Sequence, residues 1–412
     1  MDTTSVSAGA RWLALLLAFS LALSALPRLS YGLIDDDGPD DESDEVTAEE
    51  LSYIDIPVDE RIFLVPWNEV PYNKRFFDYS HAEIEERWDE FMIGVRAPFP
   101  SAGYLEYMGS NYPEMLNGIE NFQGYEDLSR RLVEVWRLFL RGDFQDAREE
   151  GLKLGIMGLY PAMFAQITYA IYLADRQTEK YMMLQDVANR VREHIDLIER
   201  AADDPIASEL VAFTKLGYAY AIARIAEESP VPVIVVRGYI GRIKDNAEEI
   251  VELIPDHPLG HAFRAAVDAN IMRRVGRATG RITYGARSTV VDESFGKAFK
   301  MAPDIPILNY EYANAIMYMS RKRDLNQAID YLNKATRYTP TWSMDALDTM
   351  YAFKRLQEAH LYDQYYRSFR AFERHRRRFS RVTDHNLTNV LSPPLNMHMM
   401  ENPHEYRLPD VK

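Results

Sequence analysis

The sequence predicts an all-α protein: an irregular α-solenoid of stacked antiparallel helix hairpins, spanning residues 61–377. From residue 80 onward, apolar residues recur three and four positions apart, which is the spacing of one helix face. The predicted helices follow one another through short connections, so neighbouring helices are expected to pair as hairpins. The stretch "VPVIVV" at 231–236 resembles a strand, but it leads directly into a helical pattern and is interpreted as the start of a helix.

Residues 1–32 have the layout of a secretory signal peptide. Arg11 precedes an apolar run from Trp12 to Pro27, and the small residues Ser30 and Gly32 suit cleavage before Leu33. The run is short for a membrane span, which needs roughly 20 apolar residues. We therefore expect a periplasmic or secreted protein with no stable membrane insertion after cleavage, the alternative being a retained anchor.

The chain contains no cysteine. It therefore forms no disulfide, no thiolate metal site and no lipid-modified cysteine, and for an exported protein of this size that favours a bacterial periplasm.

Residues 33–60 are predicted to be an acidic, disordered linker. The run "DDDGPDDESDEVTAEE" at 35–50 cannot bury enough apolar surface to fold, and the alternative is an acidic docking segment. The net charge of the whole chain is -16. This charge argues against binding to nucleic acid or anionic lipid.

The first helix is predicted over 81–95, because Ser80 and Glu83 form a capping-box pattern. Apolar spacing, with glycine and proline at the ends of the segments, then predicts the remaining helices. They cover residues 125–141, 143–155, 161–174, 178–203, 206–228, 233–254, 259–275, 288–301, 307–320, 324–338, 342–358 and 360–377. A glycine-rich insertion at 276–289 is expected to be a loop, serving either as a long connection or as part of a binding side.

The segment 309–342 carries the clearest repeat. In its second helix Ala328, Leu332, Ala335 and Pro340 lie at successive spacings of four, three and five. Its first helix places Tyr312, Ala315, Ile316 and Met319 at packing positions. This pattern resembles the tetratricopeptide (TPR) family, in which small residues let two helices approach closely. Degenerate copies occur at 141–149, 252–263 and 294–306.

The resemblance implies a non-enzymatic scaffold that holds a protein or extended peptide in a concave groove lined by the first helices of the hairpins. In the clearest repeat the groove residues are Tyr310, Ala313, Met317, Ser320 and Arg321. No catalytic constellation and no cofactor fingerprint is found. We therefore predict neither an enzyme nor a cofactor.

The alternative function is a small-molecule- or copper-binding accessory component of a periplasmic transport system. Residues 378–412 are predicted to be an extended tail, and thioether and imidazole side chains within it suit copper. These candidates are Met397, His398, Met399, Met400 and His404; the competing interpretation is a tail packed on the solenoid. His257 and His261 have metal-ligand spacing, but Pro258 between them favours a capping or packing role.

Overall fold

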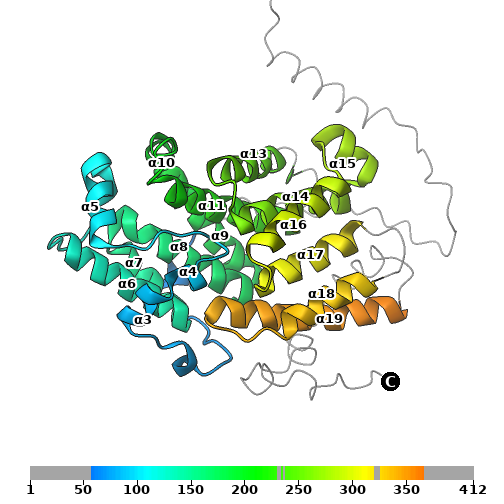
Figure 1. Ribbon diagram of the computed structural model, residues 1–412, viewed down its shortest axis with the longest axis horizontal. Helices are drawn as coiled ribbons and strands as arrows, with labels where there is room; N and C mark the ends of the chain where they lie inside the picture. The colour runs from blue at the N-terminus through cyan, green and yellow to red at the C-terminus, as the bar shows by residue number, and fades with distance from the viewer. Residues whose placement is uncertain (1–56, 230–232, 235–236, 320–324, 366–412) are drawn as a thin grey trace, which may run out of the picture. The chain divides into compact units, whose positions relative to one another are not determined.

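The computed structural model describes residues 57–229, 233–234, 237–319 and 325–365 (Figure 1). Within these ranges it contains sixteen α-helices, three 3-10 helices and no strand, which confirms the all-α prediction. The chain divides into two units, Met1–Glu45 and Val46–Lys412, and every described residue belongs to the second. The predicted signal peptide, the acidic run at 35–50 and the tail at 378–412 lie outside the described residues.

The described chain begins with short helices joined by turns. They are η1 (Glu60–Phe63), η2 (Lys74–Phe77), α3 (His81–Glu86), α4 (Trp88–Phe91), α5 (Ala102–Asn111) and η3 (Pro113–Leu116). The predicted capping box is confirmed, since Ser80 and Glu83 each bond the other's backbone N–H. The single helix predicted over 81–95 is wrong, because the chain breaks at Arg87 and the second helix ends at Phe91. Helix α5 was not predicted, because two of its ten residues are glycine and few of them are buried.

The central helices agree more closely with the sequence pattern. They are α6 (Tyr125–Arg141), α7 (Phe144–Leu152), α8 (Gly155–Tyr172), α9 (Gln177–Glu193), α10 (Ile195–Arg200), α11 (Ser208–Glu228), α13 (Tyr239–Leu253) and α14 (Pro258–Val275). Helix α6 begins and ends at the predicted residues. It ends at Gly142, whose left-handed φ of 96° lets the chain reverse into α7. The helix predicted over 178–203 is two helices, α9 and α10, which meet at His194.

Helices α7 and α8 approach each other unusually closely. A Cβ atom on Gly158 would overlap the backbone carbonyl of Gly151, so both positions depend on the absence of a side chain. Nearly every residue of α8 is buried. This helix is therefore the central element of the core, and other helices pack around it.

The C-terminal helices are α15 (Arg277–Tyr284), α16 (Ser288–Met301), α17 (Pro306–Met319), α18 (Asn326–Thr336) and α19 (Ser343–Tyr365). The loop predicted at 276–289 is wrong, because most of it forms α15. That helix buries only Gly280 and exposes Ile282, so it contributes no buried apolar side chain to the core. The two helices predicted at 342–358 and 360–377 are continuous through residue 359, since no glycine or proline interrupts them there.

The segment of the predicted repeat forms the helix pair α17 and α18, and α19 packs against both (Figure 1). The predicted packing positions Ala328, Leu332 and Ala335 are fully buried between these helices. Tyr312 of the first helix is also buried, and its ring contacts Phe295 of α16 with centroids 4.7 Å apart. Local spacing therefore identified the packing face of this hairpin correctly.

Helix α19 also contacts α6 and α8, which lie far earlier in the sequence. The Ser343 hydroxyl donates to the Phe139 carbonyl at 2.7 Å, across 204 residues of sequence. The Tyr351 hydroxyl donates to the Ile171 carbonyl at 2.8 Å. In a strict solenoid each repeat contacts only its neighbours. Here α19, the last described helix, packs against α6 and α8, so the arrangement departs from a strict solenoid.

Candidate functional site

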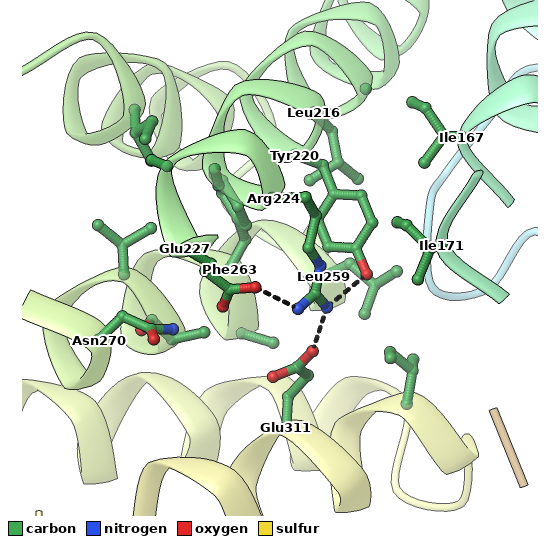
Figure 2. A pocket seen from close by; sticks show the side chains of 18 of the residues that line it. Ile167, Ile171, Leu216, Tyr220, Arg224, Glu227, Leu259, Phe263, Asn270 and Glu311 are labelled. Atoms are coloured by element: carbon green, nitrogen blue, oxygen red, sulfur yellow. Dashed lines mark hydrogen bonds and ion pairs between the residues drawn. The ribbon is translucent and has the colours of Figure 1, made fainter. Parts of the chain in front are cut away.

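An apolar cleft of about 170 Å³ lies among α8, α11, α13, α14 and α17. Its walls are predominantly aliphatic and aromatic side chains, which Figure 2 shows converging from several helices. They include Ile167 and Ile171 from α8, Leu216 from α11, and Leu259 and Phe263 from α14. Pockets of this kind, apolar with a few polar groups, are the usual form of a small-molecule site.

The sequences of α8 and α11 explain why the cleft is apolar. Helix α8 holds almost no polar residue, and α11 carries alanines and aliphatic residues on the face toward it. Gly217 of α11 allows close contact, because a Cβ atom there would overlap the thioether end of Met163. Met163 and Gly217 therefore pack closely between α8 and α11, and Gly217 lines the cleft.

A partly buried polar cluster interrupts the apolar wall. The Arg224 guanidinium donates to Glu227 at 2.8 Å, to the Tyr220 hydroxyl at 2.7 Å and to Glu311 at 2.8 Å (Figure 2). Tyr220, Arg224 and Glu227 share one face of α11, at spacings of four and three residues, whereas Glu311 comes from α17. One cation thus joins two helices and holds two carboxylates in an apolar environment.

Both members of the Arg224–Glu227 pair are charged at neutral pH. Burial acts to lower the pKa of Arg224, but the nearby charges of Glu227 and Glu311 outweigh it and raise that pKa well above its usual value. Burial acts to raise the pKa of Glu227, but Arg224 and Arg273 outweigh it and lower that pKa. A carboxylate held in its ionised form this strongly is a poor general base.

Polar atoms without a hydrogen-bond partner occur at the cleft. The Nε–H of Arg224 and the Oδ1 of Asn270 are each buried and form no hydrogen bond. The amide nitrogen of Asn270 donates to the Ala266 carbonyl at 3.2 Å, so its oxygen is the atom of that amide without any partner. Buried polar groups without partners are uncommon and costly. These two atoms are a donor and an acceptor that no described group satisfies.

A protonated carboxyl group lies next to the cleft. The Tyr172 hydroxyl, which lines the cleft, donates to Asp348 of α19. Burial, reinforced by the charges of Asp345 and Glu311, raises the pKa of Asp348 to about 8. Asp348 is only 2% exposed, so it serves as an internal hydrogen-bonding group of the helix packing.

The structure places the predicted groove residues in different environments. Ala313 and Met317 are 0% and 2% exposed and pack against α18 and α19. A partner could not reach these two side chains without separating the helices, because they lie in a helix interface and not in an open groove. Tyr310 is partly buried beside Tyr351, with ring centroids 6.2 Å apart. Ser320 and Arg321 lie outside the described residues.

The capping role predicted for His257 is confirmed. Its Nδ1 accepts from the Gly260 N–H at 3.0 Å at the start of α14, and His261 bonds the Pro255 carbonyl at 2.8 Å. Within the described part of the chain, no group of three or more His, Cys, Asp or Glu side chains could hold a metal ion. The copper candidates Met397, His398, Met399, Met400 and His404 lie outside that part.

The fold and cleft together define an all-α protein with an apolar interhelical cleft. No family model, curated protein or solved structure matches the chain. Among the described helices, none combines the length and the hydropathy needed to cross a membrane. The assignment of a function therefore rests on the cleft itself.

Sequence analysis did not identify this cleft. One signal was present: Tyr220, Arg224 and Glu227 form a polar stripe at helical spacing in the second half of α11, which is otherwise rich in alanine and isoleucine. Glu311, which completes the cluster, lies 87 residues from Arg224. No local pattern connects the two positions.

Proposed function

We propose that this protein is a non-catalytic binding protein whose cleft holds a small ligand with an apolar body and one hydrogen-bonding group. The observation that carries the proposal is the pair of unpartnered atoms, Arg224 Nε and Asn270 Oδ1, in an otherwise apolar cleft. A hydroxyl or amide group on the ligand would satisfy both a donor and an acceptor. The apolar body would gain roughly 25 cal/mol for each Å² it buries.

Binding is favoured over catalysis by the state of the charged groups. Arg224 already neutralises part of the charge of Glu227 and Glu311, and these three groups are fixed by their mutual bonds. Acid–base catalysis needs a group whose pKa lies near the working pH. The pKa of Glu227 is lowered away from that range. Asp348, whose pKa is raised to about 8, is buried behind Tyr172 and does not line the cleft.

The tetratricopeptide-like architecture, export to the periplasm or outside the cell, and a role as a transport accessory belong to the same proposal. The α17–α18 pair supports the repeat resemblance, since its small residues lie buried at the helix contact. The layout of residues 1–32 supports export. A small-ligand protein in that compartment would act as a carrier or accessory for a molecule that is poorly soluble in water.

Filling the cleft tests the proposal. Ala223 and Ala266 both line it. In the full chain, Ala223→Trp and Ala266→Trp should each weaken binding of the neutral apolar dye N-phenylnaphthylamine by about tenfold or more, equivalent to about 1.4 kcal/mol. Fluorescence titration measures the affinity.

The matched control is Ala82→Trp on the exposed face of α3, which should bind the dye as the unaltered protein does. Thermal unfolding of each variant checks that it is folded, and Ala266→Leu provides a smaller obstruction should either tryptophan variant unfold. Unchanged dye binding in the folded cleft variants would refute the cleft as the binding site.

A further inference from the structure

A second pocket, of about 270 Å³, lies among α9, α11 and α13. Its polar lining includes three arginines, Arg192, Arg237 and Arg242, and the amides of Gln185 and Asn189. Of the described residues that line it, none is Asp or Glu. An arginine-lined pocket is unexpected in a chain with a net charge of -16.

This pocket is separate from the apolar cleft. Tyr220 and Arg224 of α11 line the cleft, whereas Tyr218 and Ile222 of the same helix line the arginine pocket. Helices α9 and α13 both pack against α11. The arginines are therefore brought together by the packing of three helices, and their spacing does not depend on a single flexible loop.

Two of the arginines donate to neutral acceptors. Arg192 donates to the Asn189 side-chain oxygen at 2.7 Å, and Arg242 donates to the Arg237 carbonyl at 2.6 Å. The Arg242 guanidinium also lies 5.1 Å from the Tyr239 ring centroid, which fixes its orientation. Neither Arg192 nor Arg242 forms an ion pair with a described carboxylate. Since each guanidinium carries five N–H donors, most of their capacity is unused.

We propose that this pocket binds the oxyanion group of a small organic molecule, a phosphate or a carboxylate. The planar guanidinium fork matches both groups through two parallel hydrogen bonds, and charge-assisted bonds of this type are about twice as strong as neutral ones. The amide nitrogen of Asn189 adds a neutral donor, because its oxygen already accepts from Gln185 at 2.9 Å. The site is distinct from the apolar cleft, so its ligand is a second one.

Isothermal titration calorimetry on the full chain tests the proposal, using inorganic phosphate and citrate as probes at matched ionic strength. At least one anion should bind saturably. The double variant Arg192→Gln/Arg242→Gln should weaken that binding by about tenfold or more, equivalent to about 1.4 kcal/mol. The control, Arg75→Gln/Arg337→Gln, alters two exposed arginines elsewhere and should bind as the unaltered chain does.

Each outcome of the calorimetric titrations either identifies the class of ligand or refutes the proposal. Binding of phosphate alone identifies a phosphorylated ligand, binding of citrate alone identifies a polycarboxylate, and binding of both identifies a general oxyanion site. If neither anion binds, or if the folded double variant binds as tightly as the unaltered chain, the proposal is wrong. The single variant Arg192→Gln serves if the double variant unfolds, because Arg192 is exposed. Dye binding in the apolar cleft should be unchanged in all these variants, so the two proposals fail independently.

Discussion

Individual buried carboxyl groups in this protein have opposite protonation states. Glu227 is held ionised by Arg224, whereas Asp348 is protonated at neutral pH because burial raises its pKa to about 8. Asp345 on the same helix has its pKa raised by burial to about 6. The protonation states differ because the partners differ. Glu227 lies within bonding distance of the Arg224 guanidinium, whereas Asp348 accepts a hydrogen bond from the neutral Tyr172 hydroxyl.

The raised pKa of Asp348 predicts a pH-dependent stability. Between the unfolded value of 3.8 and the folded value of about 8, the folded chain keeps a proton that the unfolded chain releases. Stability from this group is therefore complete below 3.8 and is lost as pH rises to about 8. The Asp348→Asn substitution replaces the ionisable carboxyl group with an amide, so this position no longer takes up or releases a proton in this pH range. The stability difference between unaltered and variant chains should change by more than about 1.4 kcal/mol across this window.

Urea denaturation at a series of pH values measures that difference. The exposed Asp330→Asn should give a flat difference curve, because a solvated carboxyl group has similar pKa values in both states. A flat curve for Asp348→Asn would show that Asp348 is ionised in the folded protein at neutral pH.

Among the elements, the α17–α18 pair shows most directly how sequence spacing becomes packing. Ala328 and Ala335 of α18 are fully buried against α17 and α19. Small residues at these positions allow the helices to approach closely. The predicted spacing therefore identified both the helix and the face it buries.

Enlarging one of these residues should destabilise the pair. Ala328→Leu forces additional atoms into a filled interface and should lower the free energy of unfolding by about 1 to 3 kcal/mol. Asp330→Leu on the exposed face of the same helix should change it by less than about 0.5 kcal/mol. Equal effects of the two substitutions in chemical denaturation would contradict the buried assignment of Ala328.

At the scale of the whole described unit, Trp342 and α19 link distant segments. The Trp342 ring packs against Phe91 and Phe139, with centroid distances of 6.4 and 5.7 Å. Tyr79 donates to the Thr341 carbonyl at 2.6 Å, just before α19. These contacts make the stability of α4 and α6 depend on the segment that leads into α19. Stacking between neighbouring repeats alone would not produce this coupling.

Removing the Trp342 ring tests this coupling. Trp342→Ala should cost about 3 to 5 kcal/mol, as expected for truncating a buried aromatic residue. Hydrogen exchange should become faster in α6 as well as in α19, because both helices lose the same contact. Trp67→Ala is the control: its ring stacks on Tyr169 of α8 with centroids 4.2 Å apart. Faster exchange confined to α18 and α19 in Trp342→Ala would indicate independent stacking.

The sequence by itself determined most of the helices, several of their ends and the buried face of the repeat. These features depend on interactions within a few residues: Ser80 caps its own helix, Gly142 ends α6, and Leu332 lies one helical turn from Ala328. Apolar periodicity records which face is buried. It does not record which other helix covers that face.

Only the tertiary structure decided the candidate sites. The apolar cleft needs Glu311 beside Arg224, which lies 87 residues away, and the arginine pocket needs α9 and α13 on either side of α11. The contact of α19 with α6 spans 204 residues. The neighbouring helices α18 and α19 bury Ala313 and Met317, which the repeat pattern had placed in an open groove. Packing between distant helices sets these distances, and spacing along the chain does not encode them.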